Sequence, residues 1–335
     1  MKRLLAAALC LLLLVGCGGE KAADRTVCAP EEQDRLVIYT SHKEAVYGPI
    51  VREFEERTGV WVQVETGGTA ELLDRLAAEK GQPECDLLFG GGVDSLTARR
   101  DLFEPYASPL AENVDPAFRC EDGSWTAFSV VPVVLIYNPV LVRMNPPEGW
   151  ESLLDPAWRG RIAFADPLAS GSSYTALAAL VQALPGEWEE TLDAFFRNLN
   201  GRVLEGSGDV AVEVAEGSCT IGVTLEETAL KAAESNSDVA LLYPREGTVC
   251  LPDGMAVVGN ARHGDNARRF IDFCLGEDVQ RHLVSGCRRR PVRTDVDCSL
   301  PGAEDMTLLD YDLERAAGER EDVLSRWLLL REDAS

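Results

Sequence analysis

The chain has 335 residues, with 32 basic and 56 acidic side chains, a formal net charge of -24 and a pI near 4.5. This length exceeds one average domain and predicts two lobes, each able to bury a core. The negative charge argues against nucleic acid and anionic membrane surfaces as binding partners, because both are polyanions. An anionic ligand would need a local site of oriented donors, such as helix N-termini and hydroxyl groups.

The N-terminus has the features of an export signal. Lys2 and Arg3 precede an apolar run over 4–15, which is shorter than the roughly 20 residues that span a bilayer. The tetrapeptide Leu14-Val15-Gly16-Cys17 resembles a bacterial lipobox, whose cysteine is lipidated and becomes the mature N-terminus. We therefore expect a lipoprotein signal peptide over 1–16, lipidation of Cys17 and a flexible tether over 17–30. The protein is then extracytoplasmic and anchored to the cell membrane.

Eight of the ten cysteines remain once Cys10 and Cys17 are set aside, namely Cys28, Cys85, Cys120, Cys219, Cys250, Cys274, Cys287 and Cys298. An even number in an exported chain makes disulfides plausible, although the sequence does not fix their pairing. We predict only the pair Cys28–Cys85, because each precedes a strand-like run and the two strands should be neighbours. The chain has no CxxC motif and only three histidines, so neither a structural zinc site nor any other metal or cofactor is expected.

The first hundred residues alternate strands and helices. Apolar runs predict strands over 35–39, 60–64 and 86–89, with helices over 44–58 and 70–80 and a third from residue 93. This alternation predicts a parallel α/β sheet, in which ligands bind at the carboxyl ends of the strands. Every such end is rich in Gly, Ser or Thr. The ligand-binding residues predicted in this half are Thr40, Ser41, Gly68, Thr69, Gly91 and Gly92.

The middle of the chain predicts a crossover between the lobes. A long apolar strand over 125–137 contains Pro132, which does not suit a central sheet strand. We interpret it as the first hinge strand and 248–252 as the second. Lobe 1 then comprises 31–131 plus 253–335, and lobe 2 comprises 132–252.

The segment 153–180 predicts an anion-binding turn. A strand over 161–165 ends at Asp166-Pro167, and Ser170-Gly171-Ser172-Ser173 then opens a helix over 174–180. Free N–H groups at a helix N-terminus favour phosphate or carboxylate, and serine hydroxyls add donors. We predict that Ser170, Ser172 and Ser173 bind the ligand. The alternative, a serine cap that holds only water, is left open.

The remaining elements continue the α/β pattern. Helices are predicted over 187–199, 209–216, 266–275, 277–284 and 310–330, and strands over 203–204, 219–223, 239–243 and 255–259. Ser207 lies in a predicted helix cap, and Glu226 and Glu227 open the helix that follows 219–223. The run Arg288-Arg289-Arg290 is interpreted as a solvated turn.

Three segments, spread over almost the whole mature chain, carry a family resemblance. They are LVIYTSHKEAVYGPIVREFEERTGVWVQVETGGTAELLDRL, LLDPAWRGRIAFADP and GMAVVGNARHGDNARRFIDFCL. They resemble the extracellular solute-binding proteins of bacterial ABC importers, in the branch that includes ferric-ion, 2-aminoethylphosphonate and hexose-phosphate binders. The resemblance implies a two-lobed type II periplasmic-binding-protein fold, each lobe a mainly parallel sheet flanked by helices, joined by two hinge strands. It also implies a non-catalytic receptor that delivers its solute to a membrane permease, and we expect a monomer.

The choice of ligand rests on a departure from the ferric binders. These typically place adjacent tyrosines near a helix start in the second lobe, whereas 222–227 has none, and Tyr137, Tyr174 and Tyr243 are isolated. A small phosphorylated organic solute is therefore favoured: a sugar phosphate, a phosphoglycerate or an aminoalkylphosphonate. Hydroxyls would donate to its phosphate, and Glu226 or Glu227 would accept from its hydroxyl or ammonium groups.

The sequence leaves two other functions open. A ferric-ion receptor would use carboxylates and a synergistic anion in place of the tyrosine pair. An exported phosphatase would need a nucleophile with a base, and the chain contains no GxSxG or HExxH motif. His42 adjoins Ser41, but sequence neighbours at a helix start usually point apart, so we interpret His42 as a ligand contact or a surface residue.

Overall fold

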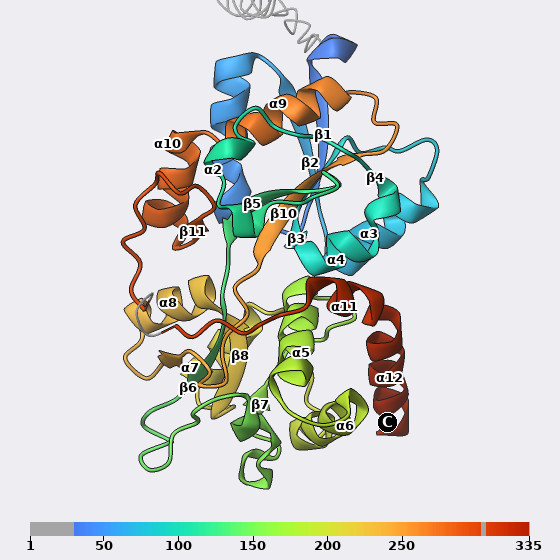
Figure 1. Cartoon of the computed structure of the whole chain (residues 1–335). Coiled ribbons are helices and arrows are strands. Elements are labelled where there is room, and N and C mark those ends of the chain that lie inside the picture. The colour runs from blue at the N-terminus through green and yellow to red at the C-terminus, as the bar shows by residue number, and fades with distance from the viewer. Residues whose placement is uncertain (1–29, 303–305, 335) are drawn as a thin grey trace, which may run out of the picture. The chain divides into compact units, whose positions relative to one another are not determined.

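The computed structural model describes residues 30–302 and 306–334. The predicted signal peptide, Cys17 and nearly all of the tether lie outside the described residues. After the short 3-10 helix η1 (Glu32–Asp34), the chain builds two α/β lobes, each around its own sheet (Figure 1). Among the described residues, no helix is both long and apolar enough to cross a membrane.

Lobe 1 is a sheet with the order β11-β5-β10-β3-β1-β2, and β4 also pairs with β10. β1 lies parallel to β2 and β3, whereas β10 runs antiparallel to β3, β4 and β5 because it returns from lobe 2. The strands are β1 (Arg35–Thr40), β2 (Trp61–Thr66), β3 (Leu87–Gly92), β4 (Phe103–Glu104), β5 (Thr126–Val130), β10 (Pro252–Val258) and β11 (Arg290–Pro291). The flanking helices are α2 (Glu44–Thr58), α3 (Thr69–Ala78), α4 (Val93–Ala98), α9 (Gly264–Cys274), α10 (Glu277–His282), the 3-10 helices η2 (Arg100–Leu102), η3 (Ala111–Asn113) and η4 (Pro116–Phe118), and the π-helix η7 (Leu283–Cys287).

Lobe 2 has a smaller sheet with the order β7-β8-β6-β9. β7 lies parallel to β8, and β6 runs antiparallel to both β8 and β9. Most strands in each lobe therefore share one direction, as predicted. The strands are β6 (Val133–Tyr137), β7 (Ile162–Ala163), β8 (Ile221–Leu225) and β9 (Ala240–Leu242). The helices are η5 (Trp150–Leu154), η6 (Pro156–Trp158), α5 (Gly171–Ala183), α6 (Trp188–Leu199), α7 (Asp209–Ala215) and α8 (Glu226–Ser235).

Each sheet is covered by apolar side chains. In lobe 1, one cluster centres on Phe54, Phe89 and Phe270, and a second includes Leu96 and Trp125. In lobe 2 the core gathers around α5, whose side chains are almost all buried. Both cores follow from apolar runs that favour buried strands with helices packed on them.

Two segments cross between the lobes side by side. β5 continues into β6, and the Val131 and Val133 N–H groups donate to the carbonyl oxygens of Leu251 (3.2 Å) and Val249 (3.1 Å). Pro132 divides the predicted strand 125–137 into β5 and β6, at a position where its missing N–H removes no ladder bond. We propose residues near 132 and 252 as the lobe boundaries.

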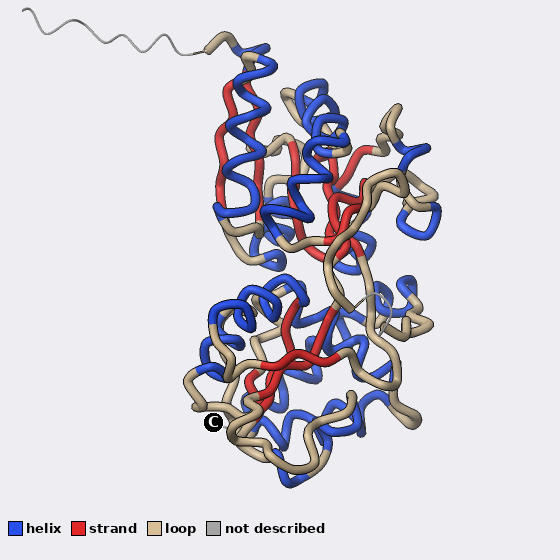
Figure 2. The backbone as a smooth tube through the Cα atoms, turned by 90° about the vertical axis from the view of Figure 1, so that its left-hand side faces the viewer, coloured by secondary structure: helices blue, strands red, loops and turns tan. Residues whose placement is uncertain are grey.

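The end of the chain departs from the predicted arrangement. The sequence predicts residues 253–335 in lobe 1, but α11 (Leu313–Gly318) is followed by α12 (Arg320–Asp333), which packs against α6 of lobe 2 (Figures 1 and 2). Trp327 is fully buried in the lobe 2 core, with its ring 5.1 Å from that of Phe196. The predicted helix over 310–330 therefore divides near Gly318. On the way, Leu309 N donates to Thr248 O at 2.9 Å, so the C-terminal segment also crosses beside the hinge.

Several smaller expectations change. The predicted strand over 203–204 is an isolated bridge between Leu204 and Ala165, and 248–252 forms no extended strand before β10. The described cysteines, Cys85 among them, are all free thiols. Cys28 lies outside the described residues.

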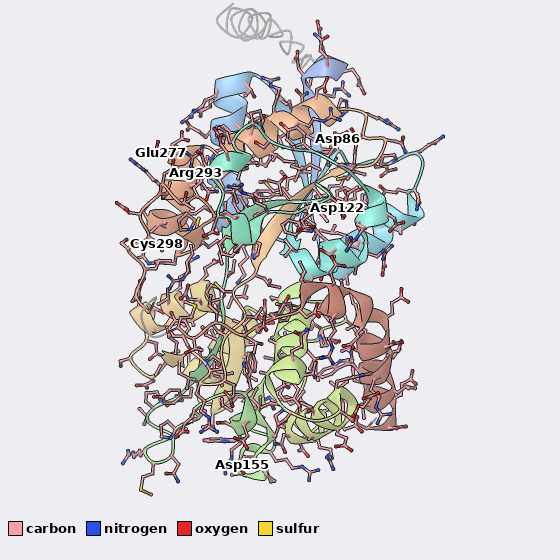
Figure 3. The ribbon with its side chains drawn as sticks, viewed as in Figure 1. Asp86, Asp122, Asp155, Glu277, Arg293 and Cys298 are labelled. Carbon is pink, nitrogen blue, oxygen red and sulfur yellow. The ribbon has the colours of Figure 1, made fainter. Side chains whose placement is uncertain are left out.

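The end of the lobe 1 sheet away from lobe 2 is held by a buried carboxylate. Asp86, labelled in Figure 3, accepts from Val37 N (2.8 Å) and His263 N (2.8 Å). This ties β1 and the start of β3 to the turn after β10. The opposite, carboxyl ends of β1, β2 and β3 are left facing lobe 2, where the cleft lies.

Candidate ligand-binding cleft

A cavity of about 600 Å³ lies between the lobes, which suits a small solute. Lobe 1 supplies the segments after β1, β2 and β3, and lobe 2 supplies the start of α5, the turn before α7 and the start of α8. The lining residues used below are Ser41, His42, Gly68, Thr69, Gly91, Gly92, Ser170, Ser172, Thr175, Ser207, Glu227, Asp253 and Arg289.

The lobe 1 wall depends on the conformation at the end of β3. Gly90 and Gly91 have φ angles of +111° and +94°, which other residues rarely adopt. A Cβ atom on Gly91 would lie 2.7 Å from Thr69 Cγ2. The glycines therefore permit both the turn and the close approach of α3.

Besides α8, three helices of more than two turns begin at the cavity. α2 starts after Ser41 and His42, α3 starts at Thr69, and α5 starts at Gly171. Ser170 caps α5 by accepting from Ser173 N at 3.3 Å, and its hydroxyl lies 3.1 Å from that of Ser172. Helix N-termini with adjacent hydroxyls form a region of donors that suits an anion.

Nine of the twelve predicted ligand-binding residues line this cavity. They are Ser41, Gly68, Thr69, Gly91, Gly92, Ser170, Ser172, Ser207 and Glu227. The carboxyl-end rule thus brings together residues from six separate segments.

The other three have structural partners instead. Thr40 is fully buried, and its hydroxyl donates to Phe89 O at 2.6 Å and accepts from His42 N at 3.1 Å, so it joins β1 to β3. Ser173 is buried within the first turn of α5. Glu226 is almost inaccessible and pairs with Arg290 Nε (2.9 Å) and with the Tyr243 hydroxyl. These side chains do not reach the cavity.

A buried charge cluster forms one end of the cavity. Arg289 Nε donates to Glu227 from lobe 2, and its Nη1 donates to Asp253 from lobe 1 and to Ser129 Oγ (3.1 Å). Lys231 Nζ contacts the second oxygen of Glu227 at 2.6 Å. Burial raises the pKa of Asp253, whereas the charges of Arg289 and Lys231 outweigh burial and hold the pKa of Glu227 below its ordinary value.

The interpretation of Arg288-Arg289-Arg290 as a solvated turn is wrong. Arg289 is 6% exposed, and the Arg290 side chain is 11% exposed. Their partners lie more than 60 positions earlier in the sequence, on α8. Only the unusual density of arginine marked this turn, and charge density alone does not reveal burial.

His42 is the second residue at this end. Its Nε2 is buried, has no hydrogen-bond partner among the described residues, and lies 3.5 Å from Asp253 Oδ2. The ring packs edge-on against Phe89 with centroids 4.7 Å apart. Burial, together with the charge of Arg289, holds the pKa of His42 well below 6.5, so the ring is neutral at physiological pH.

The lobes approach closely at the far edge of the cleft. Thr175 Oγ1 from lobe 2 donates to Asp94 Oδ2 from lobe 1 at 2.6 Å. A Cβ on Gly68 would lie 2.6 Å from the carbonyl oxygen of Ala169. The structure is therefore a closed arrangement. Within the described ranges, no group of three or more His, Cys, Asp or Glu side chains is placed to hold a metal ion.

Residues 82–316 match the family model described as bacterial extracellular solute-binding protein. The chain belongs to this family. The match covers more than half of the sequence and includes parts of both lobes, which agrees with the two-lobed fold. The solute-binding protein is thus an extracytoplasmic component of an ABC importer, and this family consists of transport receptors.

Known relatives divide by ligand. The chain is 28% identical over 306 residues to iron uptake protein A1 of Synechocystis, covering 85% of this chain and 82% of that one. It is 24% identical over 258 residues to a putative 2-aminoethylphosphonate-binding periplasmic protein of Salmonella typhimurium, covering 72% and 73%. Among solved structures, the periplasmic binding protein AfuA of Actinobacillus pleuropneumoniae, with fructose 6-phosphate bound, superposes with a TM-score of 0.80 at 25% identity, covering 89% of this chain and 98% of that one.

Proposed function

We propose that this solute-binding protein captures a small phosphorylated organic solute, with a sugar phosphate favoured, and delivers it to a membrane permease without catalysis. The observation that carries the proposal is the donor region at the starts of α2, α3 and α5, where Thr69, Ser170 and Ser172 line the cavity. Such a region suits a phosphate group. The sugar-phosphate complex of the similar AfuA structure supports this assignment.

The end of the cavity at Arg289 favours a neutral polyol over an ammonium group. Both carboxylates there are already paired, Glu227 with Arg289 and Lys231, and Asp253 with Arg289 and Ser129. An ammonium group would need an unpaired carboxylate, whereas sugar hydroxyls can both donate to and accept from such a balanced cluster. At this end of the cavity, a sugar phosphate is therefore favoured over an aminoalkylphosphonate.

A ferric-ion receptor is the second candidate, because iron uptake protein A1 is among the similar relatives. Fe(III) prefers hard anionic oxygen ligands. The cavity lining includes hydroxyls, glycines and apolar residues together with the carboxylates of Glu71, Asp74, Glu205, Glu227 and Asp253, and it includes no tyrosine among the described residues. To use Glu227 or Asp253 as ligands, a ferric ion would have to break their contacts with Arg289.

Titration calorimetry tests the proposal with fructose 6-phosphate, fructose, 2-aminoethylphosphonate and ferric citrate. We expect binding of fructose 6-phosphate and none of fructose. Ser172→Ala should weaken binding of fructose 6-phosphate and of inorganic phosphate alike, by about 1 to 3 kcal/mol, because one hydroxyl donor is lost. Tight binding of ferric citrate with no response to either phosphate compound would establish the second candidate instead.

We also propose that the protein is attached to the cell membrane through lipidated Cys17. The lipobox-like tetrapeptide before Cys17 carries this proposal. Cys17→Ala should release the protein into the medium or leave it unprocessed, as membrane fractionation and intact-mass measurement would show. A correctly cleaved mutant that stays in the membrane fraction would contradict it.

A further inference from the structure

Three consecutive arginines of lobe 1 each contact a different glutamate of α8 in lobe 2. Arg288 Nε lies 2.8 Å from Glu234 Oε1, Arg289 contacts Glu227, and Arg290 Nη2 lies 2.8 Å from Glu226 Oε1. The turn between η7 and β11 is therefore an ionic contact between the lobes. It lies at one side of the cleft, beside β5.

Arg289 differs from its neighbours in reaching the cavity. Arg289 lines the cavity, whereas Arg288 and Arg290 do not. Arg288 has a φ of +60°, and this turn sends the successive side chains in different directions. The Arg289 backbone is also fixed, since its N–H donates to Leu283 O at 3.0 Å.

The guanidinium of Arg289 is held on two of its three nitrogens. Nε is bound to Glu227, and Nη1 is bound to Asp253 and Ser129. Nη2 has no hydrogen-bond partner within 30–302 and 306–334. A planar guanidinium fixed by two carboxylates presents its remaining N–H groups in a set direction.

The local charge decides what this nitrogen can bind. Arg289 and Lys231 are balanced by Glu227 and Asp253, so this end of the cavity exerts little net attraction on a dianion. The hydroxyl-rich starts of α3 and α5 lie on other segments of the lining. Their acid contacts are with Glu71, which accepts from Gly68 N at 3.3 Å, and with Asp94, which accepts from Thr175 Oγ1 at 2.6 Å. The phosphate is better placed there.

We propose that Arg289 is a specificity-determining residue, which donates from Nη2 to a neutral oxygen of the solute away from its phosphate while Nε holds Glu227 of lobe 2. The Arg289 side chain of lobe 1 would then contact the solute and, at the same time, Glu227 of lobe 2. The inference rests on the proposed function for the identity of the solute. Opening of the lobes would remove Glu227 from Arg289 and release the guanidinium from its fixed orientation.

The test compares Arg289→Gln with Arg290→Gln, a matched variant that also loses a contact with α8 but does not line the cavity. Dissociation constants are measured by calorimetry for fructose 6-phosphate and inorganic phosphate. If a variant only opens its lobes more easily, it binds both ligands more weakly by the same factor. The ratio of the two dissociation constants therefore reports the direct contact of Arg289 with the solute. Arg289→Gln should weaken fructose 6-phosphate relative to phosphate by about tenfold, the loss expected for a charged donor, and Arg290→Gln should leave the ratio within about threefold.

An unchanged ratio in Arg289→Gln, or the same change in both variants, would overturn the assignment. Arg289→Lys keeps the positive charge but has only one side-chain nitrogen, so it should change the ratio of dissociation constants in the same direction. It provides a second test if Arg289→Gln does not fold. Small-angle scattering without ligand gives an independent readout, because Arg289→Gln should increase the radius of gyration. If the wild-type protein bound neither probe, the proposed function would fail, and an unchanged radius in the variant would separately refute the link between the lobes.

Discussion

His42 illustrates how burial sets the charge of one residue in the cleft. Its ring lies between Phe89 and Phe128, and the charged groups that face it are Asp253, Arg289 and Glu227. Burial is the largest influence on its pKa and lowers it, and Arg289 adds to this effect. The neutral imidazole keeps one nitrogen able to donate or accept toward a solute.

This environment predicts a stability change with pH. In the folded protein His42 stays neutral, whereas in the unfolded chain it takes up a proton as the pH falls through about 6.5. The unfolded state then binds more protons, so the free energy of unfolding should decrease below pH 6.5, by about 1.4 kcal/mol between pH 7.5 and 5.5. Urea unfolding of the wild type and of His42→Asn at both pH values isolates this contribution. Parallel profiles would mean that His42 takes up a proton over the same pH range in the folded and unfolded states.

The residues of the cleft were predictable where they follow local rules. Ser41, Thr69 and Ser172 lie at strand ends or helix starts, and the sequence predicts both kinds of position. Arg289 was not predictable, because its role depends on Glu227 and Asp253, which are remote in the chain. Glu226 and Glu227 are adjacent and chemically alike, and only the direction of the first turn of α8 sends one to the cavity and the other to Arg290.

At the scale of elements, α12 shows why helix docking was harder to predict than helix formation. Its sequence, REDVLSRWLLLRED, contains apolar residues on more than one side, and Leu328 and Leu329 are about half exposed. Without a single apolar stripe, the pattern does not indicate which lobe the helix joins. The large buried side chain of Trp327 places α12 on lobe 2, and the Arg326–Asp193 ion pair at 2.5 Å also joins α12 to this lobe.

Trp327 should therefore be essential to lobe 2. Trp327→Ala removes a fully buried ring that packs against Phe164 and Phe196, and it should lower the free energy of unfolding by roughly 3 to 5 kcal/mol. Leu329→Ala, on the same helix but 54% exposed, is the matched control and should change it by no more than about 0.5 kcal/mol. Denaturant unfolding measures both. If Trp327→Ala lowered the free energy of unfolding no more than Leu329→Ala does, α12 would not contribute to the lobe 2 core.

At the scale of the whole molecule, the two-lobed plan follows from the order of strands and helices, and the structure confirms it. The contacts that join the lobes do not follow from that order. Val131 pairs with Leu251 and Thr248 pairs with Leu309, and nothing in these apolar segments indicates their partners. Closure also depends on Gly68 facing the carbonyl of Ala169, a contact between backbones that leaves no pattern in the sequence.

Ligand binding should stabilise this closed molecule as one unit, because the crossing segments, Arg289 and the Thr175–Asp94 hydrogen bond join both lobes. A ligand that binds only the folded state at a hundred times its Kd adds about 2.7 kcal/mol to the free energy of unfolding. For a chain of this size, that should raise the melting temperature by roughly 4 °C. Calorimetric scans with fructose 6-phosphate should show this shift in a single transition, whereas fructose at the same concentration should leave the transition unmoved. A ligand-dependent shift confined to one of two separate transitions would mean that the solute is held by one lobe alone.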